Sequence, residues 1–200
     1  MNYYISDLHL FCEDQIDNGG PNYDGRPYKN LEEMHTAIME RWNSKVTERD
    51  RVYILGDVAM RTNRASTAAL ILMVSQLNGQ KVLIKGNHDD VTNNMYRDLF
   101  QEICDYKEIY ESFDGTAYRL VLSHYPILMW NGQHKGAILL YGHTHNTIED
   151  AFFQECIAKM NATEGMLKDY EPKVKAINVG CMKDYMDYTP RSLSELLAEN

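Results

Sequence analysis

The feature that most constrains how this chain can fold is a short apolar run that ends in polar residues. The run covers residues 82–84, and Gly86, Asn87, His88 and Asp89 follow it after a single lysine. A run of this length, bounded by glycine, predicts a buried strand that carries polar side chains at its carboxyl end. Gly86 is expected to let the backbone turn sharply at that point.

The same arrangement recurs along the chain, because five apolar runs end directly in a polar motif. These are 3–5 before Asp7 and His9, 52–55 before Asp57, 82–84 before Asn87, 120–122 before His124, and 138–141 before His143 and His145. A sixth run, 176–180, has no obvious ligand. Near-continuous apolar runs predict strands covered on both faces, and sites in such sheets collect at the carboxyl ends of the strands. We therefore expect an α/β fold in which these motifs lie close together.

Helical periodicity fills the gaps between the expected strands. Apolar residues recur every three or four positions over 31–47, and Asn30 with Glu33 resembles a capping box at the start of this segment. Further helices are expected over 64–77, 91–100, 151–160 and 191–198, the last with Pro190 at its start. A hairpin is expected over 107–122, because an Asp-Gly turn splits two strand-like runs there.

Length and composition predict one domain over residues 1–200, with a loop insertion at 11–28 and a partly helical insertion at 146–173. No apolar run approaches the roughly 20 residues of a membrane span, and the first residues do not resemble a signal peptide. The four cysteines are far apart and form no metal-binding pair. We therefore expect a cytoplasmic protein with reduced thiols and no membrane partner.

The formal net charge of −9 argues against stable binding to nucleic acid, which relies on clustered lysine and arginine. A small phosphate ester stays compatible with this charge, because bound cations would reverse the field locally. No pattern in the sequence indicates an oligomeric state.

Five of the seven histidines fall in the strand-end motifs, together with carboxylate and amide oxygens. The possible metal donors are Asp7, His9, Asp57, Asn87, His124, His143 and His145. This mixture without thiolate suits zinc, manganese or iron, and it argues against a structural zinc site. Seven donors are too many for one zinc and suit two ions if one carboxylate bridges them, for which we expect Asp57. In extended backbone, the partners of the Asp7-x-His9 pair and of the His143-x-His145 pair would point to the same side.

His88 is left without a metal to bind in this inventory. Next to Asn87 but pointing the other way, it is placed to protonate a leaving-group oxygen or to stabilise charge on a phosphoryl group. Asp89 is expected to orient His88 and so join it in catalysis, to hold the loop, or to cap a helix that begins near Val91.

These motifs, each after an expected strand and in this order, resemble the calcineurin-like metallophosphoesterase superfamily. The resemblance spans residues 5–145, and no ligand position of the family is missing. It implies a four-layer α/β/β/α sandwich of two mixed sheets flanked by helices. It also implies that Asp7, His9, Asp57 and His145 hold one ion, that Asp57, Asn87, His124 and His143 hold the other, and that His88 is the catalytic histidine.

Departures from the superfamily pattern narrow the expected activity. Serine/threonine protein phosphatases of this fold carry an Asp-Arg-Gly motif and a glutamate after Asn-His, whereas Val58 follows Asp57 here and position 89 is aspartate. DNA-repair nucleases share the ligand set but have a further DNA-binding region, for which a short acidic chain has no room. The chain is more similar to small bacterial and phage phosphoesterases, which share its patterns at 26–28, 42–43 and 178–180.

The loop after the first motif contains Arg26, which is well suited to grip a phosphate oxygen of the substrate. We expect Arg26, Asn87 and His88 to contact the substrate. The alternative for Arg26 is an exposed loop arginine beside a proline turn. Aromatic residues that could stack on a nucleobase, or simply pack, are Tyr28, Tyr125 and Trp130.

The sequence therefore predicts a dinuclear-metal phosphoesterase that hydrolyses a phosphodiester in a small, nucleotide-like substrate. A metal-bridging hydroxide would attack in line while His88 assists the leaving group. A phosphomonoesterase or a dinucleotide polyphosphate hydrolase stays open, since substrate choice resides in loops such as 11–28 and 127–136. A non-catalytic scaffold of the same fold usually lacks some of these histidines, and a mononuclear zinc hydrolase would leave donors unused.

Overall fold

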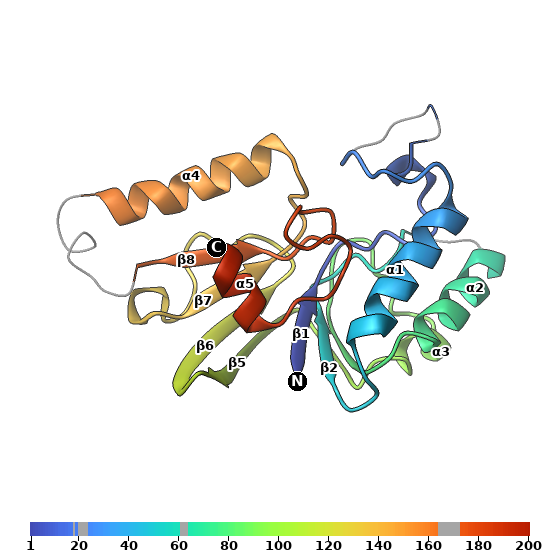
Figure 1. The fold of residues 1–200 in the computed structure, drawn as a ribbon, viewed down its shortest axis with the longest axis horizontal. Coiled ribbons are helices and arrows are strands. Elements are labelled where there is room, and N and C mark those ends of the chain that lie inside the picture. Colours follow the sequence, from blue (N-terminus) through green and yellow to red (C-terminus); the bar gives the residue numbers. More distant parts are fainter. Residues whose placement is uncertain (18, 20–23, 61–63, 164–172) are drawn as a thin grey trace.

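The apolar runs of the sequence form two four-stranded sheets in the computed structural model, which describes residues 1–17, 19, 24–60, 64–163 and 173–200 (Figure 1). The first sheet contains, in spatial order, β1 (Asn2–Ile5), β2 (Arg51–Ile54), β3 (Gln80–Ile84) and β4 (Glu102–Cys104). The second contains β5 (Tyr106–Phe113), β6 (Thr116–Ser123), β7 (Ile138–Tyr141) and β8 (Lys175–Asn178). All six expected strands are therefore present.

The two sheets and their flanking helices confirm the expected α/β sandwich, but the first sheet is parallel throughout its four strands and not mixed. Its strands alternate with α1 (Leu31–Lys45), α2 (Arg64–Ser75) and α3 (Asn94–Arg97). A crossover helix between two strands returns the chain to the end of the sheet at which the previous strand began, so that neighbouring strands run parallel. In the second sheet only β5 and β6 are antiparallel.

The first two helices form as their apolar periodicity predicts. Met34, Ile38 and Trp42 of α1 are fully buried, and they belong to the same core as the strands of the first sheet. The side chain of Asn30 accepts a hydrogen bond from the backbone of Glu33, which caps the helix as expected. This core holds the strands rigidly, so that their carboxyl ends present the polar motifs at fixed positions.

Two helices differ from expectation at their starts. The third covers only Asn94–Arg97, because Asn93 accepts from the backbone of Met95 and Tyr96 and so begins the helix late. The closing helix α5 (Leu193–Glu199) begins at Leu193 and is capped by Ser192, which forms a capping box with Glu195. Pro190 therefore lies before the helix and not at its start.

The hairpin expected over 107–122 is formed by β5 and β6, whose turn contains Asp114 and Gly115 at φ angles of 49° and 75°. Strand β4 was not expected from the sequence. It is only three residues long, and it exists because it pairs with β3 at the edge of the first sheet.

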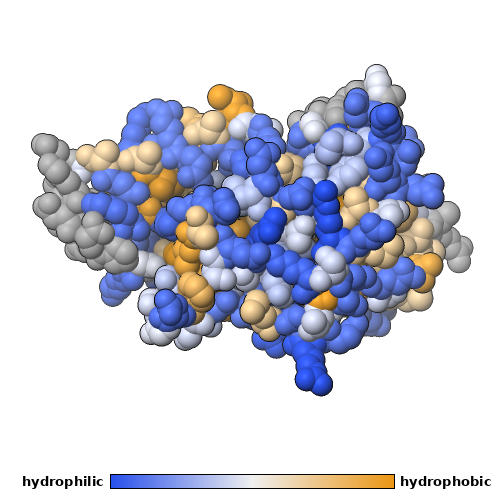
Figure 2. Space-filling view, viewed as in Figure 1, coloured by the Kyte–Doolittle hydropathy of each residue, from blue (hydrophilic) through white to orange (hydrophobic). Residues whose placement is uncertain are grey.

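The insertion at 146–173 contains α4 (Ile148–Ala162), which lies along the second sheet (Figure 1). Phe153 and Ile157 pack in a second hydrophobic cluster with residues of β6, β7 and β8. Ile148 and Phe152 are exposed on the other side of α4, and Figure 2 shows hydrophobic residues over this helix on a largely hydrophilic face. The rest of this insertion, 164–172, and residues 18 and 20–23 of the 11–28 insertion lie outside the described residues.

The two sheets meet at the end of β1. The backbone nitrogen of Ser6 donates to the carbonyl of Val179 at 2.9 Å, and the nitrogen of Cys181 donates to the carbonyl of Ser6 at 2.9 Å. This short parallel pairing places the carboxyl end of β1 beside that of β8. The motifs that follow the strands of both sheets therefore lie at the same end of the molecule. Within the described part of the chain, none of the helices has the length and apolar character needed to cross a membrane.

Candidate metal centre

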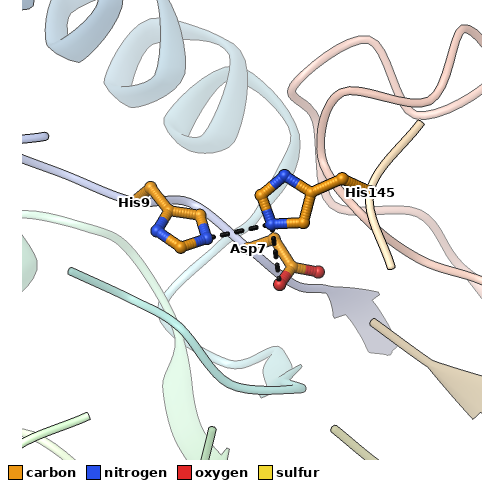
Figure 3. Close-up of side chains that lie close together, drawn as sticks. All are labelled: Asp7, His9 and His145. Atoms are coloured by element: carbon orange, nitrogen blue, oxygen red, sulfur yellow. Dashed lines mark hydrogen bonds and ion pairs between the residues drawn. The ribbon is translucent and has the colours of Figure 1, made fainter. Parts of the chain in front are cut away.

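The predicted metal ligands from both sheets come together in two groups at the carboxyl ends of the strands. One group consists of Asp7, His9 and His145, and the other of Asp57, His124 and His143. In each group one possible ligand atom from every residue lies within 4.8 Å of the others. The first group contains side chains from the ends of β1 and β7, and Figure 3 shows them facing one another.

In the first group the possible ligand atoms lie close to one another. The Nε2 atoms of His9 and His145 are 3.1 Å apart, and Nε2 of His145 is 3.6 Å from Oδ1 of Asp7 (Figure 3). The other ring nitrogen of His145, Nδ1, bonds to Asp24, so we assign the proton to Nδ1 and a lone pair to Nε2. These donors could hold a cation.

The second group repeats this arrangement with different supports. His124 Nδ1 donates to the carbonyl of Leu55 at 2.8 Å, which leaves a lone pair on Nε2 in the neutral ring. That nitrogen lies 2.9 Å from Asn87 Oδ1 and 3.6 Å from Asp57 Oδ2. Both oxygens are acceptors too, so no proton of the neutral groups joins them. A cation fits here as well.

Asp57 lies between the two groups, as expected for a bridging carboxylate. Its Oδ2 atom is buried and has no hydrogen-bond partner among the described residues. The same oxygen lies 3.7 Å from His9 Nε2 and 3.6 Å from His124 Nε2. Its other oxygen, Oδ1, accepts from the backbone nitrogen of His88 at 2.9 Å. An unpaired buried carboxylate oxygen is costly, and a pair of cations on either side would compensate for it.

The backbone at these ligands differs from the expected extended form. Asp7, His9, Asp57, His143 and His145 have φ angles of 57°, 46°, 54°, 69° and 48°. The strands end before these five residues, each of which lies in a left-handed conformation. Such conformations cost on the order of 1–3 kcal/mol each and persist where the surroundings hold them. Here His143 donates its backbone N–H to both oxygens of Asp7, at 3.1 and 3.0 Å.

Gly86 is required for a reason other than the expected sharp turn, because it has no positive φ. A Cβ atom at this position would lie 2.2 Å from Asp57 Oδ1 and 2.6 Å from the Asp57 backbone nitrogen. The glycine therefore permits the ends of β2 and β3 to approach closely. Gly56 combines both reasons, since its φ is 85° and its Cβ would lie 2.3 Å from His124 Nδ1.

His88 lies at the rim of the centre with 35% of its side chain exposed, and its Nε2 is 3.9 Å from Asp57 Oδ2. Two cavities adjoin it. One, of about 250 Å³, is lined by ligands of both groups together with Cys12 and Gln15. The other, of about 190 Å³, is lined by His88 together with Leu70, Asp90 and further residues. His88 and Met60 line both cavities, so His88 lies where the space beside the metal groups adjoins a second space.

Asp89 holds the loops and does not cap a helix. Its carboxylate accepts from the backbone nitrogens of Asp57 at 2.9 Å, Val58 at 3.0 Å and Gly86 at 2.8 Å. The helix-cap interpretation is wrong, since Asn93 caps α3. Because both oxygens are used in this way, Asp89 is a positioning residue for Asp57 and not a group directed at substrate.

The structure contradicts the expectation that Arg26 contacts substrate. Its side chain has no exposed surface. Its guanidinium donates to the carbonyls of Asp7 and Leu8 at 2.7 Å each, and its Nε atom donates to Asp24 at 3.1 Å. The alternative of an exposed loop arginine is wrong for the same reason.

Among the aromatic residues, Tyr28 and Trp130 are buried and Tyr125 is 48% exposed. The hydroxyl of Tyr125 donates to Asn87 Oδ1 at 3.3 Å, and its ring centroid lies 4.5 Å from that of His143. Tyr125 is therefore the one of these three aromatic residues that borders the metal centre with an accessible face.

Burial and neighbouring charges set the protonation of the ligands in the metal-free protein. Burial, with a contribution from the nearby Arg26 charge, lowers the pKa of His9 to about 2. Burial also lowers the pKa of His143. Burial alone would lower the pKa of His145, but the hydrogen bond to Asp24 and the charge of Asp7 outweigh it and raise this pKa. Among His9, His143 and His145, protons therefore compete most with a metal at His145 as the pH falls.

Two residues that support the candidate metal groups carry no signal in the sequence pattern. Asp24 bonds to His145 although they are 121 positions apart. Asp150 on α4 is buried and accepts from Tyr141, Thr144, Asn178 and Lys183 at 2.7 to 2.9 Å. Since Thr144 lies between His143 and His145, Asp150 supports the loop that carries both ligands. The helical insertion thus has a structural role at the centre.

Asp150→Asn is expected to destabilise the metal-free protein by about 1–3 kcal/mol at pH 7, because Lys183 and the buried donors lose their charged acceptor. Burial alone would raise the pKa of Asp150, but the bonds from Lys183, Tyr141 and Asn178 lower it below its ordinary value. The carboxylate therefore stabilises the fold above about pH 3.9, and this contribution is lost as the pH falls through the lowered pKa.

The measurement is urea unfolding of wild type and variant from pH 7 to pH 3 with chelator present. The difference between the two proteins should be largest at pH 7 and shrink below about pH 4. Glu149→Gln, an exposed neighbour on the same helix, should change stability by less than about 0.5 kcal/mol. A difference that does not depend on pH would contradict the charged role of Asp150.

Comparison with known proteins agrees with this geometry. A family model described as calcineurin-like phosphoesterase matches residues 3–179. An uncharacterized protein of Methanocaldococcus jannaschii is 30% identical over 192 residues, which cover 96% of this chain and 86% of that protein. The gene 66 protein of Mycobacterium phage D29 is 33% identical over 171 residues, which cover 73% of this chain and 79% of that protein.

A solved structure shares the fold along the whole chain. It is a protein of unknown function from Aquifex aeolicus, with a TM-score of 0.64 and 25% sequence identity, and the match covers 100% of this chain and 99% of that one. The family match includes both sheets and every residue of the two metal groups. The chain therefore belongs to the calcineurin-like phosphoesterase family.

Proposed function

We propose that this protein is a dinuclear-metal phosphoesterase that hydrolyses a phosphodiester in a small, nucleotide-like substrate. The observation that carries the proposal is the position of Asp57. One buried carboxylate oxygen without a hydrogen-bond partner among the described residues lies between nitrogen ligands of two groups, at 3.6 and 3.7 Å. This is the arrangement that a shared ligand of two ions needs.

The ligand groups support a division of the centre into two sites. Asp7, His9, Asp57 and His145 would hold one ion, and Asp57, Asn87, His124 and His143 would hold the other. Imidazole, carboxylate and amide ligands without thiolate suit manganese, iron or zinc. When bound, two such ions activate water as the nucleophile and neutralise charge on the phosphoryl group.

His88 would donate a proton to the leaving-group oxygen. It is the histidine of the centre that belongs to neither metal group. Its side chain is 35% exposed, compared with 13% for His145, 3% for His9 and 1% for His124. A phosphoryl group above the metals would direct its leaving group past His88 into the second cavity.

The second cavity favours a diester over the alternatives. A phosphomonoester has a single organic group, whereas a diester has two and can use the space on both sides of His88. Asp90 lines the second cavity, and a carboxylate there disfavours a leaving group that carries further phosphate charge, as in a dinucleotide polyphosphate. An uncharged alcohol of moderate size fits this space better.

The test compares bis(p-nitrophenyl) phosphate with p-nitrophenyl phosphate, using manganese-loaded wild type and His88→Ala. We expect faster cleavage of the diester. His88→Ala should lose about 10²- to 10⁴-fold in kcat, the usual contribution of a general acid, while metal analysis still finds two ions per chain. His134→Ala, an exposed histidine outside the site, is the matched control and should retain full activity.

Three outcomes would contradict the proposal. Faster cleavage of the monoester would favour the phosphomonoesterase. Two bound ions without turnover of either ester would reject the general activity. A metal content far below one equivalent after expression with added manganese would favour the non-catalytic scaffold.

A further inference from the structure

The two metal groups are held by different parts of the chain. In the second group, His124 is oriented by the main-chain carbonyl of Leu55, directly after β2. In the first group, His145 is oriented by the side chain of Asp24, which belongs to the 11–28 insertion. A carbonyl beside a buried strand is fixed by the sheet, whereas a loop carboxylate must itself be fixed by other contacts.

Arg26 fixes the first group from the side of β1. Its two terminal nitrogens donate to the carbonyls of Asp7 and Leu8 at 2.7 Å each. These carbonyls belong to the segment in which Asp7 and His9 adopt left-handed φ angles. The planar guanidinium can hold two neighbouring carbonyls at once, which no other side chain does with the same geometry.

Asp24 connects this arginine to the other sheet. Its carboxylate accepts from Arg26 Nε at 3.1 Å and from Arg26 Nη2 at 3.1 Å. The Asp24 oxygen that accepts from Nη2 is Oδ2, and this atom also lies 3.0 Å from His145 Nδ1. Gln15, with its amide nitrogen turned toward this carboxylate, donates to Asp24 Oδ1 at 3.0 Å. Asp24 has no exposed side-chain surface, so these contacts are not shared with solvent.

A continuous chain of contacts therefore runs from the backbone of Asp7 and Leu8, through Arg26 and Asp24, to His145. Its two ends come from different sheets, and both ends supply ligands to the same metal group. A carboxylate that accepts from the distal nitrogen of a metal-binding histidine fixes the ring orientation and increases its basicity.

We propose that Asp24 and Arg26 are positioning residues that set the metal affinity of the first group, Asp7, His9 and His145, without setting that of the second. The inference rests on the proposed dinuclear function and adds an asymmetry to it. The ion of the first group depends on Asp24 and Arg26, whereas the second group has other supports, among them the Leu55 carbonyl at His124 and Asp89 at Asp57.

The test is a calorimetric titration of the metal-free protein with Mn²⁺ for wild type and Asp24→Asn. Wild type should show two binding events. Asp24→Asn should weaken one of them by about 10- to 100-fold, the usual effect of removing such a partner, and leave the other within about twofold. Asp17→Asn removes an exposed carboxylate from the same loop and should change neither event.

Arg26→Lys tests the other half of the chain of contacts. Lysine retains the charge beside Asp24 but cannot hold both carbonyls, so the same binding event should weaken. Asp24→Glu retains the carboxylate and should recover part of the affinity that Asp24→Asn loses. Urea unfolding of each variant in chelator measures stability separately from metal binding.

Two results would overturn the inference. In one, Asp24→Asn binds two ions as wild type does. In the other, both events weaken in proportion to a general loss of stability. Binding of fewer than two ions by the wild type would instead contradict the proposed dinuclear function, and the inference with it. The wild-type titration therefore tests the proposed function, and the variant titrations test the inference.

Discussion

Asp57→Asn is expected to lower turnover of bis(p-nitrophenyl) phosphate by about 10³-fold or more, because several kcal/mol of charge stabilisation are lost at the centre. Asp57 is the carboxylate that faces both metal groups, and its Oδ2 atom is buried without a hydrogen-bond partner among the described residues. Asparagine has one oxygen in place of two and no negative charge. Either its oxygen or its NH₂ group must face the imidazole nitrogens. Neither group carries the negative charge that a ligand shared by two cations needs.

Metal analysis and calorimetry separate this effect from unfolding. The variant should bind fewer than two Mn²⁺ per chain and should still fold in chelator, since removing a buried unpaired charge does not itself destabilise the metal-free protein. Asp114→Asn removes one carboxylate from the exposed turn between β5 and β6, where asparagine tolerates the φ of 49°. It should retain full activity and both ions. Two tightly bound ions in Asp57→Asn would show that the carboxylate is not shared.

Gly86→Ala is expected to destabilise the protein by about 3 kcal/mol, the upper end for overpacking, and to lower activity by about 10²-fold. The added Cβ would lie 2.2 Å from Asp57 Oδ1 and 2.6 Å from the Asp57 nitrogen. One of these atoms belongs to the backbone, so rotation of a flexible side chain cannot relieve the clash. The ends of β2 and β3 must separate, and Asp57 moves away from the metal groups.

Gly115→Ala provides the control for introducing alanine in place of glycine. Gly115 has a φ of 75°, but apart from the glycine and its two chain neighbours no described residue has a heavy atom within 4 Å of its Cβ position. It should lose about 1 kcal/mol through backbone strain and retain full activity. Urea unfolding and diester turnover measure both properties in each variant. If Gly86→Ala retained wild-type activity, the close approach of the two strands would not be what positions Asp57.

The sequence alone predicted the strands other than β4, and it predicted the residues that form the two candidate metal groups. Apolar runs such as 82–84 are local signals, because a buried strand needs only its own side chains to be recognised. The polar residues that follow them are equally local, so Asn87 and His124 could be named without knowing which strands are neighbours. Their order along the chain was sufficient to recognise the family, which the match over residues 3–179 confirms.

Only the tertiary structure decided how these residues are supported. Arg26 was expected to meet substrate, but it donates to the carbonyls of Asp7 and Leu8 and is buried. Asp24 and Asp150 carried no signal, because their partners are brought near by strand pairing between distant segments.

The backbone at the ligands was decided in the same way. The sequence suggested extended strands through Asp7 and His9, whereas both residues adopt left-handed φ angles. Local preference disfavours that conformation for residues other than glycine. It persists because hydrogen bonds from the other strands hold it, such as the bond from the His9 nitrogen to the carbonyl of Asp57 at 3.0 Å. The identity of the ligands is thus a property of short segments, and their geometry is a property of the folded sheets.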